Sequence, residues 1–257
     1  MTRIQAKLGP YPALGKRDVH LWYLDLEDSR IGERECASLL STDETARAAR
    51  LRFARDRRHF NICRAALRML LASYLEEEPS RLIFSYSAKG KPELGGIHKS
   101  RGLRFNVSHS GEMACVGVTL WRRIGVDIEA IRYDVEIKAI AQRFFSVSEQ
   151  RDLADLSPDD QHRGFFNCWA RKEAYLKALG SGLSMPLSEF DVSLRPGEPA
   201  CLLATRPDPN EAKRWTMLEP ELREKYATAI VAEGAGLELT CGELISCFGS
   251  GDADANS

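Results

Sequence analysis

The chain lacks the features that mark several protein classes. No stretch of its 257 residues is apolar over the ~20 positions that a membrane-spanning helix needs. The N-terminal region places Arg3 and Lys7 close to Pro10 and Pro12 and has no apolar core like that of a signal peptide. The net charge is -1, so no overall positive field attracts nucleic acid or an anionic membrane. We therefore expect a cytoplasmic protein that binds neither nucleic acid nor a membrane.

The sequence also lacks a cysteine pattern typical of a zinc site or a disulfide framework. Its seven cysteines are scattered and odd in number, and no two of them form a Cys-x-x-Cys pair. Such an arrangement favours reduced, partly buried thiols in a reducing compartment.

The spacing of apolar residues predicts an α+β fold. With 44% hydrophobic residues, the chain can form one large domain or two modest ones. Helices are expected from Ser41, over 57–75 with a stop at Pro79, from Ser146, and over 165–179. Strands are expected at 20–26, 82–86, 103–107, 114–120, 124–128, 190–194, 201–204, 215–218 and 226–232. The tail from Gly249 has too few apolar residues to fold and is expected to be disordered.

Two short segments recur at a nearly constant distance along the chain. Ser41-Thr-Asp-Glu returns 105 residues later as Ser146-Val-Ser-Glu, and Phe60-Asn returns 106 residues later as Phe166-Asn. Both copies of the first are capping-box patterns, which begin helices. Repeats this short leave chance and a real duplication open. A duplication would give two similar α+β halves with a ligand groove between them.

The segment 125–129, Gly-Val-Asp-Ile-Glu, reads as a strand with its two carboxylates on one face. In a strand, Asp127 and Glu129 point the same way, and their charges repel unless they are solvated or bridged by a cation. Oxygen ligands suit Mg²⁺, which keeps water or phosphate in its other positions. The alternative is a strand whose outer face is simply solvated.

The segment 169–183 reads as a helix that ends at two glycines. Trp169, Glu173 and Lys177 recur every fourth residue and therefore share one helix face. Glu173 and Lys177 could form an ordinary surface ion pair. The large indole in line with them argues against a fully solvated face, and Gly180 and Gly182 allow a tight return of the chain.

Two further segments carry polar or basic groups suited to phosphate. The strand ending in Ser108 and His109 can present side chains and backbone N–H groups to an anion, although a lone histidine in a turn is more often structural. Basic residues gather in the Lys-Gly-Lys-Pro segment at 89–92 and in six arginines between 47 and 58. These arginines either form a solvated face or hold a multiply charged anion.

Taken in order, these segments resemble the Sfp-type 4′-phosphopantetheinyl transferases. The resemblance rests on Lys-Gly-Lys-Pro, Asn-Val-Ser-His-Ser, Gly-Val-Asp-Ile-Glu and Trp-x-x-Lys-Glu-Ala-x-x-Lys-x-x-Gly-x-Gly-Leu, which span residues 89–183. A looser match extends it back to about Arg47. It implies a monomer of two α+β halves related by a pseudo-twofold axis, with the active site in the cleft between them. The expected parts are an N-terminal half (1–120) with coenzyme A phosphate-binding segments, a C-terminal half (121–248) with the metal site and catalytic helix, and the tail (249–257).

The resemblance also implies an activity and a set of site residues. The expected reaction moves the 4′-phosphopantetheine arm of coenzyme A to a serine of an apo acyl, polyketide or peptidyl carrier protein and releases 3′,5′-ADP. Mg²⁺, or Mn²⁺ in its place, would neutralise the pyrophosphate, and Glu173 or water is the candidate base. The implied metal ligands are Asp127, Glu129 and Glu173; the implied catalytic residues are Glu173, Lys177 and Asp127; the implied coenzyme A contacts are Arg47, Lys89, Lys91, Pro92, Ser108, His109 and Lys177.

Two rival functions belong to other classes. One is a non-catalytic module that binds coenzyme A or a carrier protein, and the other is a different Mg²⁺-dependent phosphotransferase. Retention of Asp127, Glu129, Glu173 and Lys177 together argues against the first, because a site without catalysis has no need of all four.

Overall fold

The computed structural model describes residues 12–28, 30–87, 90–180, 185–206, 208–220 and 222–244. Within these ranges the same order of elements occurs twice. The first series is β1 (Asp18–Asp25), α1 (Glu33–Leu39), α2 (Thr42–Ala49), α3 (Ala54–Leu75), β2 (Phe84–Tyr86), β3 (Pro92–Leu94), β4 (Leu103–Ser110) and β5 (Met113–Leu120). The second is β6 (Ile124–Ala130), α4 (Ile137–Phe144), α5 (Val147–Ala154), α6 (Pro158–Leu179), β7 (Phe190–Val192), β8 (Leu202–Thr205), β9 (Trp215–Leu218) and β10 (Tyr226–Glu233), followed by β11 (Glu238–Glu243).

The two series share one buried structural device, which confirms the prediction of two similar halves. Ser41 and Ser146 both begin a helix with a complete capping box. The capping-box glutamate is buried in each half and pairs with a buried cation of the long helix, Glu44 with Arg68 at 2.7 Å and Glu149 with Lys172 at 2.7 Å. An unpaired carboxylate at this depth would be costly, so each pair fixes the short helix against the long one.

The long helices also set the register of the repeat. Helices α3 and α6 each have 22 residues, and each ends at a residue in the left-handed conformation, Glu76 and Gly180. Their ends and their buried cations are all 104 residues apart. The Phe-Asn echo at a distance of 106 is therefore out of register with the helices by two residues.

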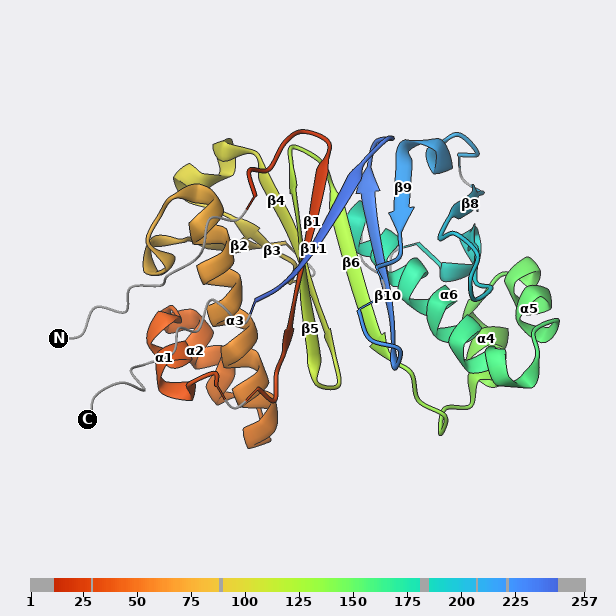
Figure 1. Ribbon diagram of the computed structural model, residues 1–257, viewed down its shortest axis with the longest axis horizontal. Coiled ribbons are helices and arrows are strands. Elements are labelled where there is room, and N and C mark those ends of the chain that lie inside the picture. The colour runs from red at the N-terminus through yellow and green to blue at the C-terminus, as the bar shows by residue number, and fades with distance from the viewer. Residues whose placement is uncertain are drawn as a thin grey trace, which may run out of the picture.

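The layers run from helix to helix across two sheets (Figure 1). Helices α1 to α3 lie on the outer side of a sheet with the order β11-β1-β5-β4, and helices α4 to α6 lie on the outer side of a sheet with the order β6-β10-β9. A third apolar cluster, which includes Leu21, Cys115, Val126 and Ile230, fills the space between the sheets. Each sheet is thus covered on both faces by apolar side chains.

Most predicted strands and helices are present, with shifts of a few residues at their ends. The predicted end of helix α3 at Leu75 is confirmed. The residue that ends the helix is Glu76, which turns left-handed, and not the expected Pro79, which begins a short 3-10 turn. The short elements α1, α4, β3 and β11 were not predicted. The tail from Gly249 lies outside the described residues. In the described part of the chain, no helix is long and apolar enough to cross a membrane.

Candidate active site

The candidate residues gather along a seam where the halves meet, formed by β4, β6 and α6. Strands β4 and β6 are edge strands of different sheets, and β4 uses side chains instead of its backbone to pair with β6. Three alternate β4 side chains accept hydrogen bonds from alternate N–H groups of β6: Asn106 from Val126 at 2.8 Å, Ser108 from Ile128 at 3.4 Å, and Ser110 from Ala130 at 3.1 Å. This ladder satisfies an otherwise open strand edge and places the polar face of β4 beside the carboxylates of β6.

Helix α6 lies unusually close to β6 because residue 125 is glycine. A Cβ atom at Gly125 would stand 2.0 Å from the carbonyl oxygen of Ala174 and 2.4 Å from the backbone nitrogen of Ala178. The two alanines keep the facing side of the helix narrow. This close approach brings Glu173 and Lys177 to the level of the carboxylates on β6.

Lys177 on α6 forms an ion pair with Asp127 on β6, within the second half. Its Nζ donates to Asp127 Oδ1 at 2.6 Å, to Ser108 Oγ at 2.9 Å and to the carbonyl oxygen of Val126 at 3.2 Å. Ser108 Oγ also donates to Asp127 Oδ1 at 3.0 Å. Asp127 is 3% exposed, so the reading of this strand face as solvated is wrong at this residue. The sequence-based alternative of a surface pair between Glu173 and Lys177 also differs from the structure, where the partner of Lys177 is Asp127.

Three acidic side chains, Asp127, Glu129 and Glu173, form what we call the carboxylate cluster. Burial raises the pKa of Asp127, against the opposing effect of Lys177. Burial, with the charge of Asp127 second, raises the pKa of Glu129 to about 6 and also raises the pKa of Glu173. When all three carboxylates are ionised, their negative charge is larger than the positive charge that Lys177 brings to the cluster. A further cation would therefore be stabilised there.

The donor set of the cluster suits a hard divalent cation. All its ligand atoms are oxygens, and Asp127 Oδ2 is buried with no hydrogen-bond partner among the described residues. Ser110 Oγ donates to Glu129 Oε2 at 3.0 Å and so orients that carboxylate. As the side chains stand, no three acidic, histidine or cysteine groups among the described residues converge enough to enclose an ion by themselves. A cation here would need further oxygens from substrate or water, as Mg²⁺ commonly does.

Two family models and several curated relatives match this chain. Residues 123–231 match the 4′-phosphopantetheinyl transferase superfamily, and residues 33–119 match the 4′-phosphopantetheinyl transferase N-terminal family. The chain is 37% identical to the 4′-phosphopantetheinyl transferase HetI of Nostoc sp. (strain PCC 7120), over 85% of this chain and 89% of that relative. The chain belongs to the 4′-phosphopantetheinyl transferase family. This family transfers the phosphopantetheine group from coenzyme A to carrier proteins.

The chain is also similar to two more distant proteins. The 4′-phosphopantetheinyl transferase Sfp of Bacillus subtilis (strain 168) is 29% identical over 67% of this chain and 74% of its own. The crystal structure of Thermotoga maritima holo-(acyl-carrier-protein) synthase is 21% identical, with a TM-score of 0.35, over 43% of this chain and 61% of that chain. The family assignment does not depend on the structural similarity.

Apart from Lys177 on α6, the coenzyme A contacts implied by the transferase resemblance belong to the first half of the chain. His109 is exposed on the face of β4 opposite Ser108, and the protein around it together with Lys177 lowers the pKa of its imidazole. Arg47 is exposed on α2, with its guanidinium 5.8 Å from the ring centre of Phe60 and 6.0 Å from that of Tyr86.

The Lys-Gly-Lys-Pro segment is only partly described. Pro92 is half-buried at the start of β3, and Lys91 directs its ammonium to backbone carbonyls of the second half. Lys89 lies outside the described residues.

Sequence reasoning missed the residues that hold this transferase site together. Asn106 and Ser110 were not singled out, although they alternate with Ser108 and therefore share its face of β4. That alternation was the available signal. The partner of each side chain was not predictable, because β6 belongs to a different sheet.

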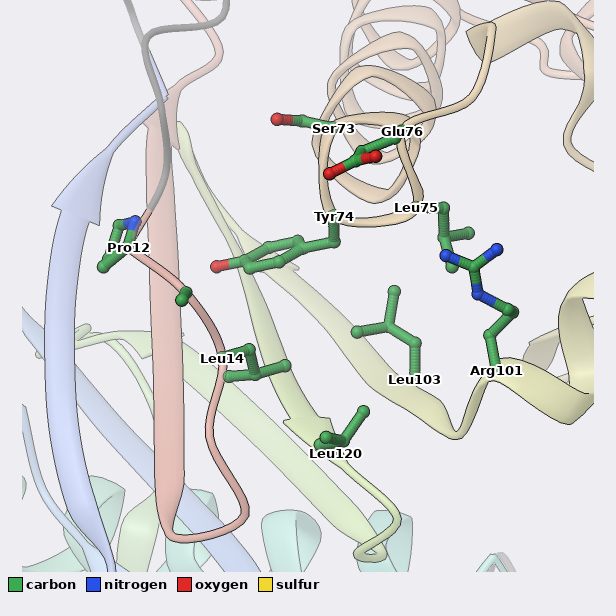
Figure 2. A pocket seen from close by; sticks show the side chains of 10 residues that line it. Pro12, Leu14, Ser73, Tyr74, Leu75, Glu76, Arg101, Leu103 and Leu120 are labelled. Atoms are coloured by element: carbon green, nitrogen blue, oxygen red, sulfur yellow. The ribbon is translucent and has the colours of Figure 1, made fainter.

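A separate pocket of about 500 Å³ lies away from the seam, on the first half. Figure 2 shows it between the C-terminal end of α3, with Tyr74 and Leu75, the segment of Pro12 and Leu14, and the start of β4 at Leu103. It contains none of the predicted site residues.

Proposed function

We propose that this protein is a Mg²⁺-dependent transferase that moves the 4′-phosphopantetheine arm of coenzyme A to a serine of an apo carrier protein and releases 3′,5′-ADP. The carboxylate cluster carries the proposal, because it collects three buried or half-buried acids around one lysine and leaves Asp127 Oδ2 without a partner in the part of the chain that the structure describes. Such a cluster is poorly suited to stability alone and well suited to holding a cation beside a phosphate.

Asp127, Glu129 and Glu173 would hold the ion. When bound, Mg²⁺ (or Mn²⁺) supplies positive charge to the pyrophosphate oxygens and so allows three carboxylates to lie beside an anionic substrate. The hydrogen bond from Ser110 to Glu129 would keep the carboxylate oxygens of the cluster oriented before coenzyme A binds.

The chain's own residues account for the proton and the leaving charge. Glu173, on the same helix face as Lys177, would accept the proton of the carrier serine, with water as the alternative base. The bond from serine oxygen to phosphorus forms as the bond from phosphorus to the 3′,5′-ADP oxygen breaks. Lys177, on the same helix face as Glu173, is placed to stabilise the negative charge that develops on the departing phosphate.

The first half would bind the cofactor substrate. By the resemblance, Arg47, Lys89, Pro92, Ser108 and His109 contact coenzyme A, and the basic groups among them hold its phosphates. The exposed positions of Arg47 and His109 are compatible with this role.

One assay tests the activity and another tests the metal. Purified protein, Mg²⁺, coenzyme A and an apo carrier should yield a carrier whose mass has increased by one phosphopantetheine group. EDTA should abolish the reaction, and Mg²⁺ or Mn²⁺ should restore it. A carrier of unchanged mass under all conditions would point to a binding module, and full activity in metal-free buffer would refute the role of the carboxylate cluster.

The acceptor and the assembly state are part of the same proposal. We expect a cytoplasmic monomer that accepts acyl, polyketide or peptidyl carriers, since both halves of the site lie in one chain. Transfer to a fatty-acid carrier and to a peptidyl carrier, compared side by side, measures this breadth. Strict use of one carrier would contradict it.

A further inference from the structure

Lys91 joins the first half of the molecule to the end of the catalytic helix. It follows the turn between β2 and β3, and its backbone is fixed there by two hydrogen bonds with Ser87, of 2.9 and 3.1 Å. Its ammonium crosses the seam and donates to the carbonyl oxygens of Lys177 at 2.6 Å and Ile124 at 3.2 Å. Both acceptors belong to the second half.

These two acceptors are at sensitive positions. The carbonyl of Lys177 lies in the last turn of α6, where carbonyls have no full set of partners within the helix and attract cations. Ile124 is the first residue of β6, the strand that carries Asp127. One ammonium therefore connects the end of the helix that holds Lys177 to the start of the strand that holds its partner.

Keeping this ammonium charged at the seam is costly. Burial lowers the pKa of Lys91 to about 8. The charge of Glu93 opposes this shift, and the weaker effects of Lys177, Arg104 and Arg123 add to it. An apolar side chain would avoid this cost, so stability alone does not explain a lysine here.

We propose that Lys91 is a positioning residue, which acts by holding the C-terminal turn of α6 against β6 so that Lys177 faces Asp127 and the reacting phosphate. The inference rests on the proposed function for its effect on turnover. It differs from the role that the family resemblance implies, in which Lys91 binds coenzyme A directly, because two of the three ammonium hydrogens are directed to protein carbonyls.

The matched test compares Lys91→Met with Arg122→Met. Arg122 also connects distant segments through backbone carbonyls, because its guanidinium donates to the carbonyl oxygens of Lys16 at 2.8 Å and Glu233 at 2.9 Å. We expect Lys91→Met to lower kcat at saturating coenzyme A by ~10- to 100-fold, the scale of a misplaced catalytic group, with the Kd for coenzyme A within about threefold of wild type. Arg122→Met should lose a similar amount of thermal stability and retain its kcat.

Hydrogen exchange tests the inference independently of transfer. Peptides that cover residues 172–180 should exchange faster in Lys91→Met than in wild type or Arg122→Met, even if no carrier is ever modified. If Lys91→Met does not fold, Lys91→Arg takes its place, because arginine keeps the charge but changes the geometry. Its kcat should again fall while the Kd for coenzyme A stays near that of wild type, but the fall in kcat should be smaller. A Kd raised tenfold with kcat unchanged, equal kcat losses in the Lys91 and Arg122 variants, or unchanged exchange at 172–180 would each overturn the proposal.

Discussion

The substitution Gly125→Ala tests how closely the site depends on the approach of α6 to β6. The new methyl group would meet the carbonyl oxygen of Ala174 at 2.0 Å and the nitrogen of Ala178 at 2.4 Å, both backbone atoms of the helix. A side chain at the helix surface could rotate away, but a helix backbone cannot. The whole segment that carries Glu173 and Lys177 must therefore move outward.

The size of the effect follows from these distances. Relieving the contact requires the helix to shift by roughly 1 Å, because a close-packed interior leaves no free volume that could take up the methyl group. A shift of about 1 Å in a catalytic group lowers turnover on the order of 100-fold, and overpacking of this kind costs about 1–3 kcal/mol of stability. The ion pair between Lys177 and Asp127, 2.6 Å long, should lengthen with it.

The assay compares kcat and the unfolding temperature of Gly125→Ala with those of Gly164→Ala. Gly164 lies on the same helix, and a methyl group there would meet the tip of the Leu156 side chain, which can move. The control should keep its kcat and gain or lose little stability, because alanine also favours the helix by about 1 kcal/mol. If Gly125→Ala keeps wild-type kcat while remaining folded, the argument that glycine sets the site's geometry fails.

Three further predictions concern single side chains. Glu173→Gln and Lys177→Ala should each lower kcat by at least ~100-fold, and wild-type rates would contradict both roles. Lys177→Ala should also lower the unfolding temperature, because it leaves Asp127 buried without its cation. Arg47→Ala should weaken coenzyme A binding more than dephospho-coenzyme A binding, measured by calorimetry, and equal weakening would place it away from the 3′-phosphate. Two arginines lower the pKa of Glu233 to about 2, so its stabilising effect is present above pH 4.5 and is lost as the pH falls toward 2. Glu233→Gln should therefore remove about 1 kcal/mol at neutral pH after solvent screening and nothing near pH 2, without changing kcat; a pH-independent loss would refute the assignment.

The sequence predicted local features better than contacts across the molecule. The capping boxes at Ser41 and Ser146 were correct because a capping box involves residues only three positions apart. The partner of Lys177 was not predictable in the same way. Helical spacing suggested Glu173, four residues away, whereas the structure pairs Lys177 with Asp127, 50 residues away on another element.

The strand β11 shows the same limit at a larger scale. It runs parallel to β1, with Asp18 opposite Glu238, and most of its residues are exposed or only half-buried. An exposed edge strand has no marked apolar alternation to reveal it. Its pairing with β1 brings the end of the second series into the sheet of the first, which no local pattern indicates.

The repeat explains why the proposed catalytic groups lie in one half, while both halves contribute to the proposed site. In the register of the long helices, Lys177 corresponds to Ser73 and Glu173 to Met69. Helix α3 therefore occupies the equivalent place in the first half but carries neither the lysine nor the glutamate. The first half contributes in another way. Its β4 side chains, Ser108 above all, pair with β6 and hold Asp127 in place. The carboxylates therefore depend on a surface that the second half cannot supply to itself, and for this reason the site lies at the seam.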